Sequence, residues 1–171
     1  MILGIPTSTY TLIHVVLSLI GIGSGAVVLF GLLNARRLDR WTAVFLITTA
    51  ATSVTAFGFP FDHLLPSHKV AILSLLVLAI AIAARYGFRL SGHWRWIYVV
   101  TAQLALYFNV FVLVVQAFEK VPALKALAPT QSEAPFLIAQ MFVLATFVAL
   151  AIVALRRFCV DQVGSPLQKA S

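Results

Sequence analysis

The chain has 171 residues, of which 61% are hydrophobic and only 10% are charged, with a formal net charge of +7 at pH 7. A soluble domain carries about 25% charged residues. This composition therefore excludes an ordinary water-soluble domain and predicts that most of the chain faces lipid. The surplus of Lys and Arg does not indicate a nucleic-acid binder, because these residues fall in short breaks between apolar runs and not on a solvated face.

Five apolar runs approach or reach the roughly 20 residues that a helix needs to cross a bilayer. They are residues 10–33, 41–59, 69–86, 96–118 and 136–155. The third run is the shortest, and a re-entrant segment is the alternative reading there. The first run follows no basic stretch, so we expect it to be retained and not cleaved as a signal peptide. The sequence thus predicts an all-α integral membrane protein. It forms a single domain over residues 1–171, a five-span bundle that ends in a short polar tail, residues 159–171.

The basic residues predict the direction of each span. Nine fall in the first and third connections and after the fifth run: Arg36, Arg37, Arg40, Arg85, Arg89, Arg95, Arg156, Arg157 and Lys169. The second and fourth connections hold the other three: Lys69, Lys120 and Lys125. Because cytoplasmic loops of membrane proteins are enriched in Lys and Arg, this alternation predicts an outer N-terminus and a cytoplasmic C-terminus.

A pair of glycines and a single cysteine bear on how the chain could assemble. Gly21 and Gly25 in the first run are four residues apart, a spacing that lets another helix approach closely. This helix belongs either to the same bundle or to another subunit of a homo-oligomer. Cys159 is the only cysteine, so an internal disulfide is excluded. Other membrane subunits and the lipid bilayer itself are the expected partners, and no nucleic acid is expected.

The predicted directions place most polar side chains in the outer half of the bundle. The expected ligand-binding set is His14, Asn109, Gln116 and Gln140. Asn109 and Gln116 are seven residues apart, so they share one face of the fourth helix. Polar groups in hydrocarbon are costly unless they bond to one another or line a cavity. We therefore predict a polar pocket open to the outer face, with unrelated interhelical hydrogen bonds as the alternative.

A metal or haem site is a second prediction for the same region. His14 in the first run and Asp62, His63 and His68 in the second connection are the candidate ligands. Imidazole and carboxylate suit transition metals, and two imidazoles can ligate a haem axially. The spacing of these residues matches no established metal motif, and the sequence contains no motif that names a catalysed reaction.

The stretches FGFPFDHLLPSHK and KALAPTQSEAPF resemble those of small bacterial inner-membrane proteins. The resemblance implies a bacterial inner (plasma) membrane and no particular activity. The leading prediction is a non-enzymatic accessory subunit, or a component that binds an apolar ligand such as a quinone, lipid or pigment. The alternatives are a small redox or metal/haem-binding protein that uses His14 with His63 or His68, and a channel or transporter.

Overall fold

The computed structural model describes residue 2, residues 4–59 and residues 66–160. Five long helices cross the molecule: α1 (Thr7–Leu33), α2 (Asp39–Thr55), α3 (Pro66–Ile82), α4 (Trp94–Lys120) and α6 (Ala134–Leu155). A 3₁₀ turn extends α2 over Ala56–Gly58, and π-helical turns extend α3 over Ala83–Gly87 and α6 over Arg156–Val160. With these extensions, all five are long and apolar enough to span a membrane.

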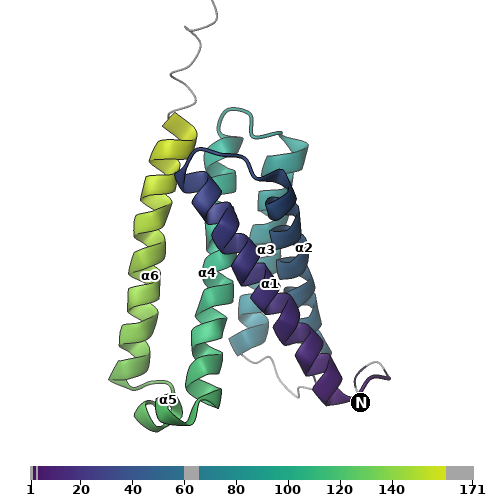
Figure 1. Cartoon of the computed structure of the whole chain (residues 1–171), viewed down its shortest axis with the longest axis vertical. Helices are drawn as coiled ribbons and strands as arrows, with labels where there is room; N and C mark the ends of the chain where they lie inside the picture. Colours follow the sequence, from purple (N-terminus) through teal and green to yellow (C-terminus); the bar gives the residue numbers. More distant parts are fainter. Residues whose placement is uncertain (1, 3, 60–65, 161–171) are drawn as a thin grey trace, which may run out of the picture.

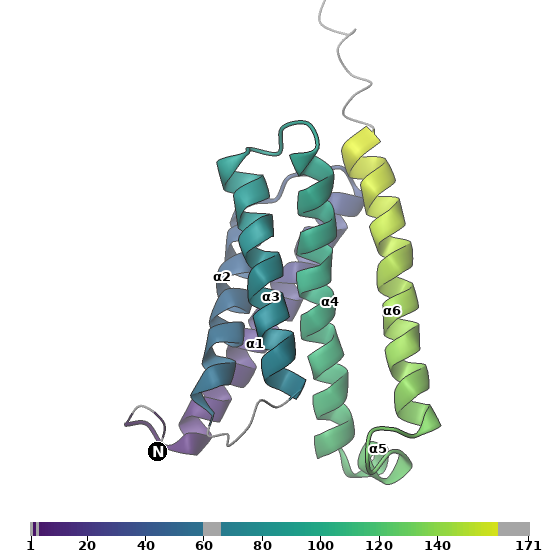
Figure 2. The same cartoon turned by 180° about the vertical axis from the view of Figure 1, so that it is seen from behind.

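The helices run alternately up and down in a bundle, with α6 beside α4 (Figures 1 and 2). One end of the bundle carries the α1–α2 and α3–α4 links and the last turn of α6, and we call it the arginine end. The other end, the α5 end, carries the start of α1 and the short helix α5 (Pro122–Leu127). The third predicted span is one continuous helix beside the others, and with its π-helical turn it is long and apolar enough to span a membrane. The sequence did not predict α5.

Helix α1 ends in a Schellman motif. The backbone N–H of Arg36 donates to the carbonyl of Gly31 (2.8 Å), and that of Ala35 donates to the carbonyl of Leu32 (3.2 Å). Ala35 takes the left-handed conformation, with φ 54°, that this motif requires. These bonds satisfy carbonyls that the end of a helix leaves free, and the left-handed residue turns the chain back toward α2.

Just before α6, Thr130 and Glu133 have the spacing of a capping box and make one of its two reciprocal bonds. The Glu133 carboxylate accepts from the backbone N–H (3.1 Å) and the hydroxyl (2.9 Å) of Thr130. In a full capping box the Thr hydroxyl would instead accept from a backbone N–H of the helix. The helix begins at Ala134, with Glu133 as its N-cap residue.

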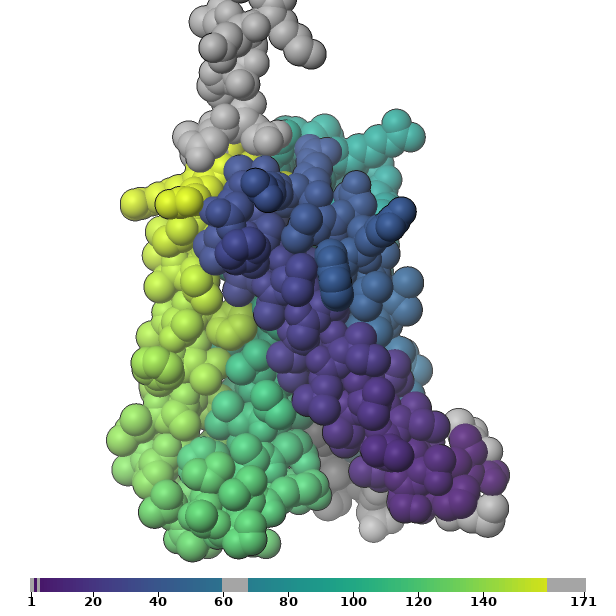
Figure 3. Space-filling model, in the orientation of Figure 1, coloured from purple at the N-terminus to yellow at the C-terminus, as the bar shows by residue number. Residues whose placement is uncertain are grey.

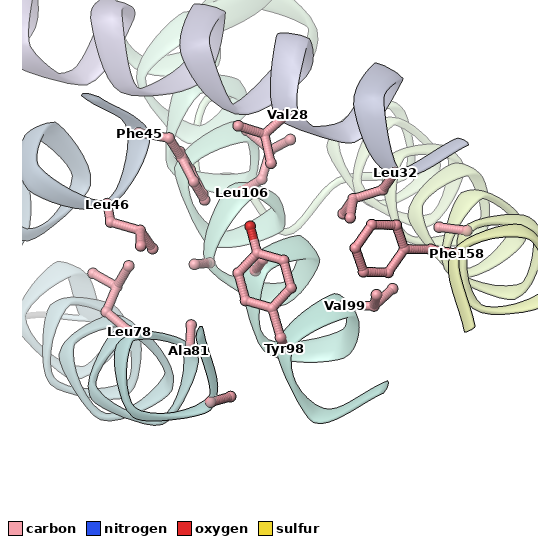
Figure 4. Close-up of a cluster of buried hydrophobic side chains, with 14 of the residues drawn as sticks. Val28, Leu32, Phe45, Leu46, Leu78, Ala81, Tyr98, Val99, Leu106 and Phe158 are labelled. Atoms are coloured by element: carbon pink, nitrogen blue, oxygen red, sulfur yellow. The ribbon is translucent and has the colours of Figure 1, made fainter. Parts of the chain in front are cut away.

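The apolar core lies toward the arginine end. Figure 4 shows Phe45, Leu78, Tyr98 and Phe158 meeting from α2, α3, α4 and the last turn of α6. Gly25 of α1 allows this close packing, because a Cβ atom there would lie 2.6 Å from Leu106 Cδ1. Five buried alanines, including two on α4, let the helix backbones approach one another in the same half. The core therefore closes one half of the bundle.

Helix α6 is the least enclosed of the five. Only 11% of its most apolar stretch is buried, against 33–39% for the other four helices. Its exposed side chains are large and apolar, including Ile138 and Phe142. Such a surface is unsuited to water and is the expected exterior of a helix that faces lipid.

Candidate functional site

A cavity of about 630 Å³ lies in the half of the bundle nearest the α5 end. Helices α1, α2, α3 and α4 form its walls. Helix α1 is tilted and diverges from α4 toward this end (Figure 1). Figure 3 shows the surface hollowed between α1, in purple, and the lower part of α4 and α5, in green. The cavity thus opens where the packed core ends.

The cavity wall mixes apolar side chains with uncharged polar groups. The polar residues from α1 to α3 are Thr11, His14, Ser18, Thr52, Ser53, His68 and Ser74. Helix α4 adds Asn109 and Gln116, and Glu119 and Lys120 stand at its end, on the rim. An apolar pocket with a few placed polar groups is the usual form of a small-molecule site.

His14 is held by a hydrogen bond across two helices. Its Nδ1 lies 2.8 Å from the hydroxyl oxygen of Thr55 on α2. The Thr55 hydroxyl donates its proton to the carbonyl of Ala51 (2.8 Å), so it accepts from His14. This geometry assigns the proton of the neutral ring to Nδ1 and leaves Nε2 as a hydrogen-bond acceptor. Phe59 packs edge-on against the imidazole, with ring centroids 5.3 Å apart, and fixes its orientation.

The N-terminal end of α1 is anchored beside His14. The Tyr10 hydroxyl donates to the Thr55 carbonyl (2.8 Å), at the point where α2 passes into its 3₁₀ segment. Gly58 makes room for this ring, since a Cβ there would lie 2.6 Å from Tyr10 Cζ. Helix α1 is therefore fastened to α2 at this end while it diverges from α4.

Two further polar contacts tie the cavity walls together. The Asn109 amide donates to the Thr49 hydroxyl (3.1 Å), beside Gly21 of α1. The Ser53 hydroxyl lies 3.2 Å from that of Ser74, which joins α2 to α3. The Ser53 hydroxyl also lies 3.0 Å from the Thr49 carbonyl, so its one proton is shared between two acceptors. The Asn109 carbonyl oxygen stays available for a bound molecule. Polar side chains of four helices thus meet around one cavity.

The structure brings three of the four expected ligand-binding residues together. His14, Asn109 and Gln116 line the cavity, whereas Gln140 does not. Gln140 lies on α6, and its amide donates to the carbonyl of Phe111 on α4 (3.2 Å). It belongs to the α4–α6 contact, on a different face of α4 from Asn109 and Gln116.

The expected metal ligands are only partly described. His14 and His68 both line the cavity, and the His68 ring stacks on Phe57 with centroids 5.4 Å apart. Asp62 and His63 lie outside the described residues. Among the residues that the structure describes, no group of three or more His, Cys, Asp or Glu side chains is placed to hold a metal ion.

Gly21 and Gly25 both face helices of the same chain. A Cβ at Gly21 would lie 3.1 Å from the Thr49 hydroxyl oxygen, and one at Gly25 would collide with Phe45 and Leu106. Their faces of α1 are therefore filled by α2 and α4, and another subunit would have to bind elsewhere. Oligomerisation itself stays a prediction.

Sequence reasoning missed the polar cluster at the arginine end. The Arg85 guanidinium pairs with Asp39 and lies over the ring of Tyr98, 5.1 Å from its centroid. The Tyr98 hydroxyl lies 3.4 Å from that of Thr42. Asp39 and Arg85 are 46 positions apart, so no local pattern connects them.

No family model matches the chain, and comparisons with curated proteins and with solved structures found no significant match. The class of the protein rests on its own fold. Over the residues that the structure describes, the regular structure is helical and includes five helices of membrane-spanning length and composition, which indicates a multi-pass membrane protein.

Proposed function

We propose that this protein is a non-enzymatic membrane component that binds a neutral, amphipathic small molecule, such as a quinone, lipid or pigment, in the cavity between α1 and α4. The single observation that carries the proposal is this cavity, which Asn109, Gln116 and the hydrogen-bonded His14 line together. The protein acts alone or as an accessory subunit of a membrane complex.

The distribution of charge supports an orientation for this site. Eight arginines and Asp39 lie at the arginine end, whereas the described charged residues at the α5 end are Lys69, Lys120, Lys125, Glu119 and Glu133. The positive-inside rule then favours a cytoplasmic arginine end in a bacterial inner membrane. The N-terminus and the cavity would lie in the outer half, within reach of molecules dissolved in the outer leaflet.

The chemistry of the wall favours an uncharged ligand. Apart from the histidines, the only charged side chains among the described lining residues are Glu119 and Lys120, on the rim. A charged headgroup deeper in the cavity would lose its hydration without gaining a counter-ion, which is costly. Hydroxyl and carbonyl groups fit better, because His14 Nε2 can accept a hydrogen bond and the amide of Gln116, which lines the same cavity, can donate one.

The test is to identify what co-purifies with the protein. Protein purified in mild detergent should release about one equivalent of a single apolar molecule on solvent extraction, detected by mass spectrometry. Val112→Phe, which fills the cavity, should abolish retention, and His14→Ala should reduce it at least severalfold, because one hydrogen bond is worth about 1 kcal/mol.

Thr146→Val is the matched control. Thr146 is exposed on α6 and bonds only to the carbonyl of its own helix at Phe142 (2.8 Å), so the variant should retain the molecule like the wild type. Absence of any stoichiometric molecule, or unchanged retention by Val112→Phe, would contradict the proposal.

One observation favours a second candidate, a haem or metal protein. His14 and His68 line the same cavity from α1 and α3, as axial ligands of one cofactor would. An absorption spectrum and elemental analysis of the purified protein test this directly. A Soret band, or a stoichiometric metal lost in His68→Ala, would replace the first proposal. A spectrum without such a band, together with no bound metal, would remove the second.

A further inference from the structure

Four arginines lie at the corner where the end of α1 contacts the last turn of α6, at the arginine end. Arg36 closes the Schellman motif of α1 and Arg37 follows it, and Arg156 and Arg157 begin the last turn of α6. The Arg157 guanidinium reaches the carbonyl of Leu33, at 3.5 Å, which lies within the motif. The side chains of all four arginines are exposed.

The packing below these arginines holds the corner together. Phe158 inserts beside Leu32 and Val99 (Figure 4), so the last turn of α6 is fixed against α1 and α4. Phe158 is only 2% exposed. The two arginine pairs therefore keep their places relative to each other, although they are 120 positions apart in the chain.

The corner has no counter-charge in the part of the chain that the structure describes. Asp39 is the only described carboxylate at this end, and it pairs with Arg85. Glu119 and Glu133 lie at the opposite end. The four guanidinium groups repel one another and present a site for an external anion. Arginine matches phosphate in particular, because its planar fork donates two parallel hydrogen bonds.

The surface next to the corner is apolar. Phe30, one turn before Asn34, is 65% exposed, and Ile152, one turn before Arg156, is 47% exposed. A molecule that combines a phosphate with hydrocarbon chains would satisfy both surfaces at once. Soluble anions such as inorganic phosphate would use only the arginines.

We propose that this corner of α1 and α6, which we call the arginine corner, binds the headgroup of an anionic phospholipid, with the acyl chains along the two helices. The site is distinct from the cavity between α1 and α4, and it holds whether or not that cavity is occupied. It joins the loosely packed α6 to the rest of the bundle through a lipid shared by both helices.

Native mass spectrometry of the purified protein tests the proposal, with phosphatidylglycerol and phosphatidylcholine titrated separately. We expect the protein to retain one molecule of phosphatidylglycerol tightly. Phosphatidylcholine should bind more weakly and without saturation. A basic side chain near an anionic lipid surface contributes about 1 kcal/mol, or about fivefold in affinity. The double variant Arg156→Gln/Arg157→Gln should therefore weaken phosphatidylglycerol binding by about 25-fold. This loss of affinity should be smaller in high salt, because salt screens the charges.

Arg40→Gln/Arg89→Gln is the matched control. It removes the same charge at the same end, but from the first turn of α2 and from the residues just after α3. Helices α2 and α3 are separated from α6 by α1 and α4 (Figures 1 and 2). This variant should bind phosphatidylglycerol within about twofold of the wild type. Equal losses in both double variants would show a diffuse positive field and overturn the site.

Two further outcomes would also overturn the proposal. Full displacement of phosphatidylglycerol by millimolar inorganic phosphate would show a site for a soluble anion and not for a lipid. Equal retention of the two phospholipids by the wild type would show that the arginines select no headgroup. Circular dichroism of each double variant checks that the helices are intact.

Discussion

Arg85 shows how a single ionic side chain is accommodated at the boundary of the bundle. Its side chain is only 6% exposed, while its partner Asp39 is 83% exposed. The guanidinium thus lies among the helices and its counter-charge lies in water. Tyr98 beneath it and Tyr86 beside it supply aromatic faces, at 5.1 and 5.8 Å from their centroids. The three contacts connect α2, α3 and α4.

Replacing Arg85 should therefore destabilise the protein more than replacing an exposed arginine. We expect Arg85→Gln to lower the free energy of unfolding by about 2 kcal/mol, because it removes a charge-assisted hydrogen bond and cation–π contacts. Arg89→Gln, at an exposed position of the next link, should change it by less than about 0.5 kcal/mol. Unfolding in mixed micelles by titration with dodecyl sulfate measures both. Equal effects would mean that the Asp39 pair contributes nothing.

At the scale of elements, α1 is placed by its glycines. Gly25 faces Phe45 and Leu106, whereas no atom lies within 4 Å of a Cβ built on Gly23. The two positions belong to the same helix, two residues apart, and differ in what surrounds them. They allow the effect of packing to be separated from that of helix propensity.

Gly25→Ala should destabilise the bundle by about 1–3 kcal/mol, because the added methyl forces the core apart. Gly23→Ala should be neutral or stabilising by up to about 1 kcal/mol, since Ala favours a helix. The same micelle titration gives both values. A neutral Gly25→Ala would contradict the close packing of α1 on α2 and α4.

The Schellman motif after α1 gives a prediction of opposite sign. Ala35 has a φ of 54°, which costs a non-glycine residue about 1–2 kcal/mol. Ala35→Gly should therefore stabilise the protein by about 1 kcal/mol. Ala145→Gly, in the middle of α6, should instead destabilise it by a similar amount. A melting temperature that falls in both variants would contradict the left-handed turn.

At the scale of the whole molecule, the orientation can be tested with single cysteines. In a Cys159→Ser background, Ser132→Cys, between α5 and α6, should react with a membrane-impermeant maleimide in intact cells. Ser91→Cys, in the α3–α4 link, should react only after permeabilisation. Both positions are exposed. The reverse pattern would invert the proposed orientation. Labelling of both cysteines in intact cells would contradict a single crossing of the membrane, by α4, between positions 91 and 132.

Much of the fold follows from local sequence properties. Each apolar run is long enough to form a spanning helix by itself, so the five long helices match the five predicted runs to within a few residues. The helices extend past the apolar residues because backbone hydrogen bonding continues into the interface. The helix α5 was not expected, since Pro122–Leu127 is too short for its periodicity to be recognised.

The sequence predicted how far along the bundle the site residues lie, but not which face of each helix turns toward the cavity. Asn109 and Gln116 both line the cavity because their spacing of seven places them on one helix face. Gln140 was expected with them and faces Phe111 instead. Gln140 is the single amide on an otherwise almost uniformly apolar α6, so its sequence does not indicate whether this side chain meets the cavity or a neighbouring helix. The pairing of Arg85 with Asp39 escaped prediction because the two residues lie 46 positions apart.

The sequence by itself determined the number of apolar helices and the alternation of basic residues between their ends, because both are set by residues adjacent in the chain. Only the tertiary structure decided how the helices turn toward one another. The tilt of α1 away from α4 opens the cavity in one half, and the packing of Phe158 beside Leu32 brings the arginines of α1 and α6 together. Both depend on contacts between residues far apart in the chain, which hydropathy and charge patterns do not encode.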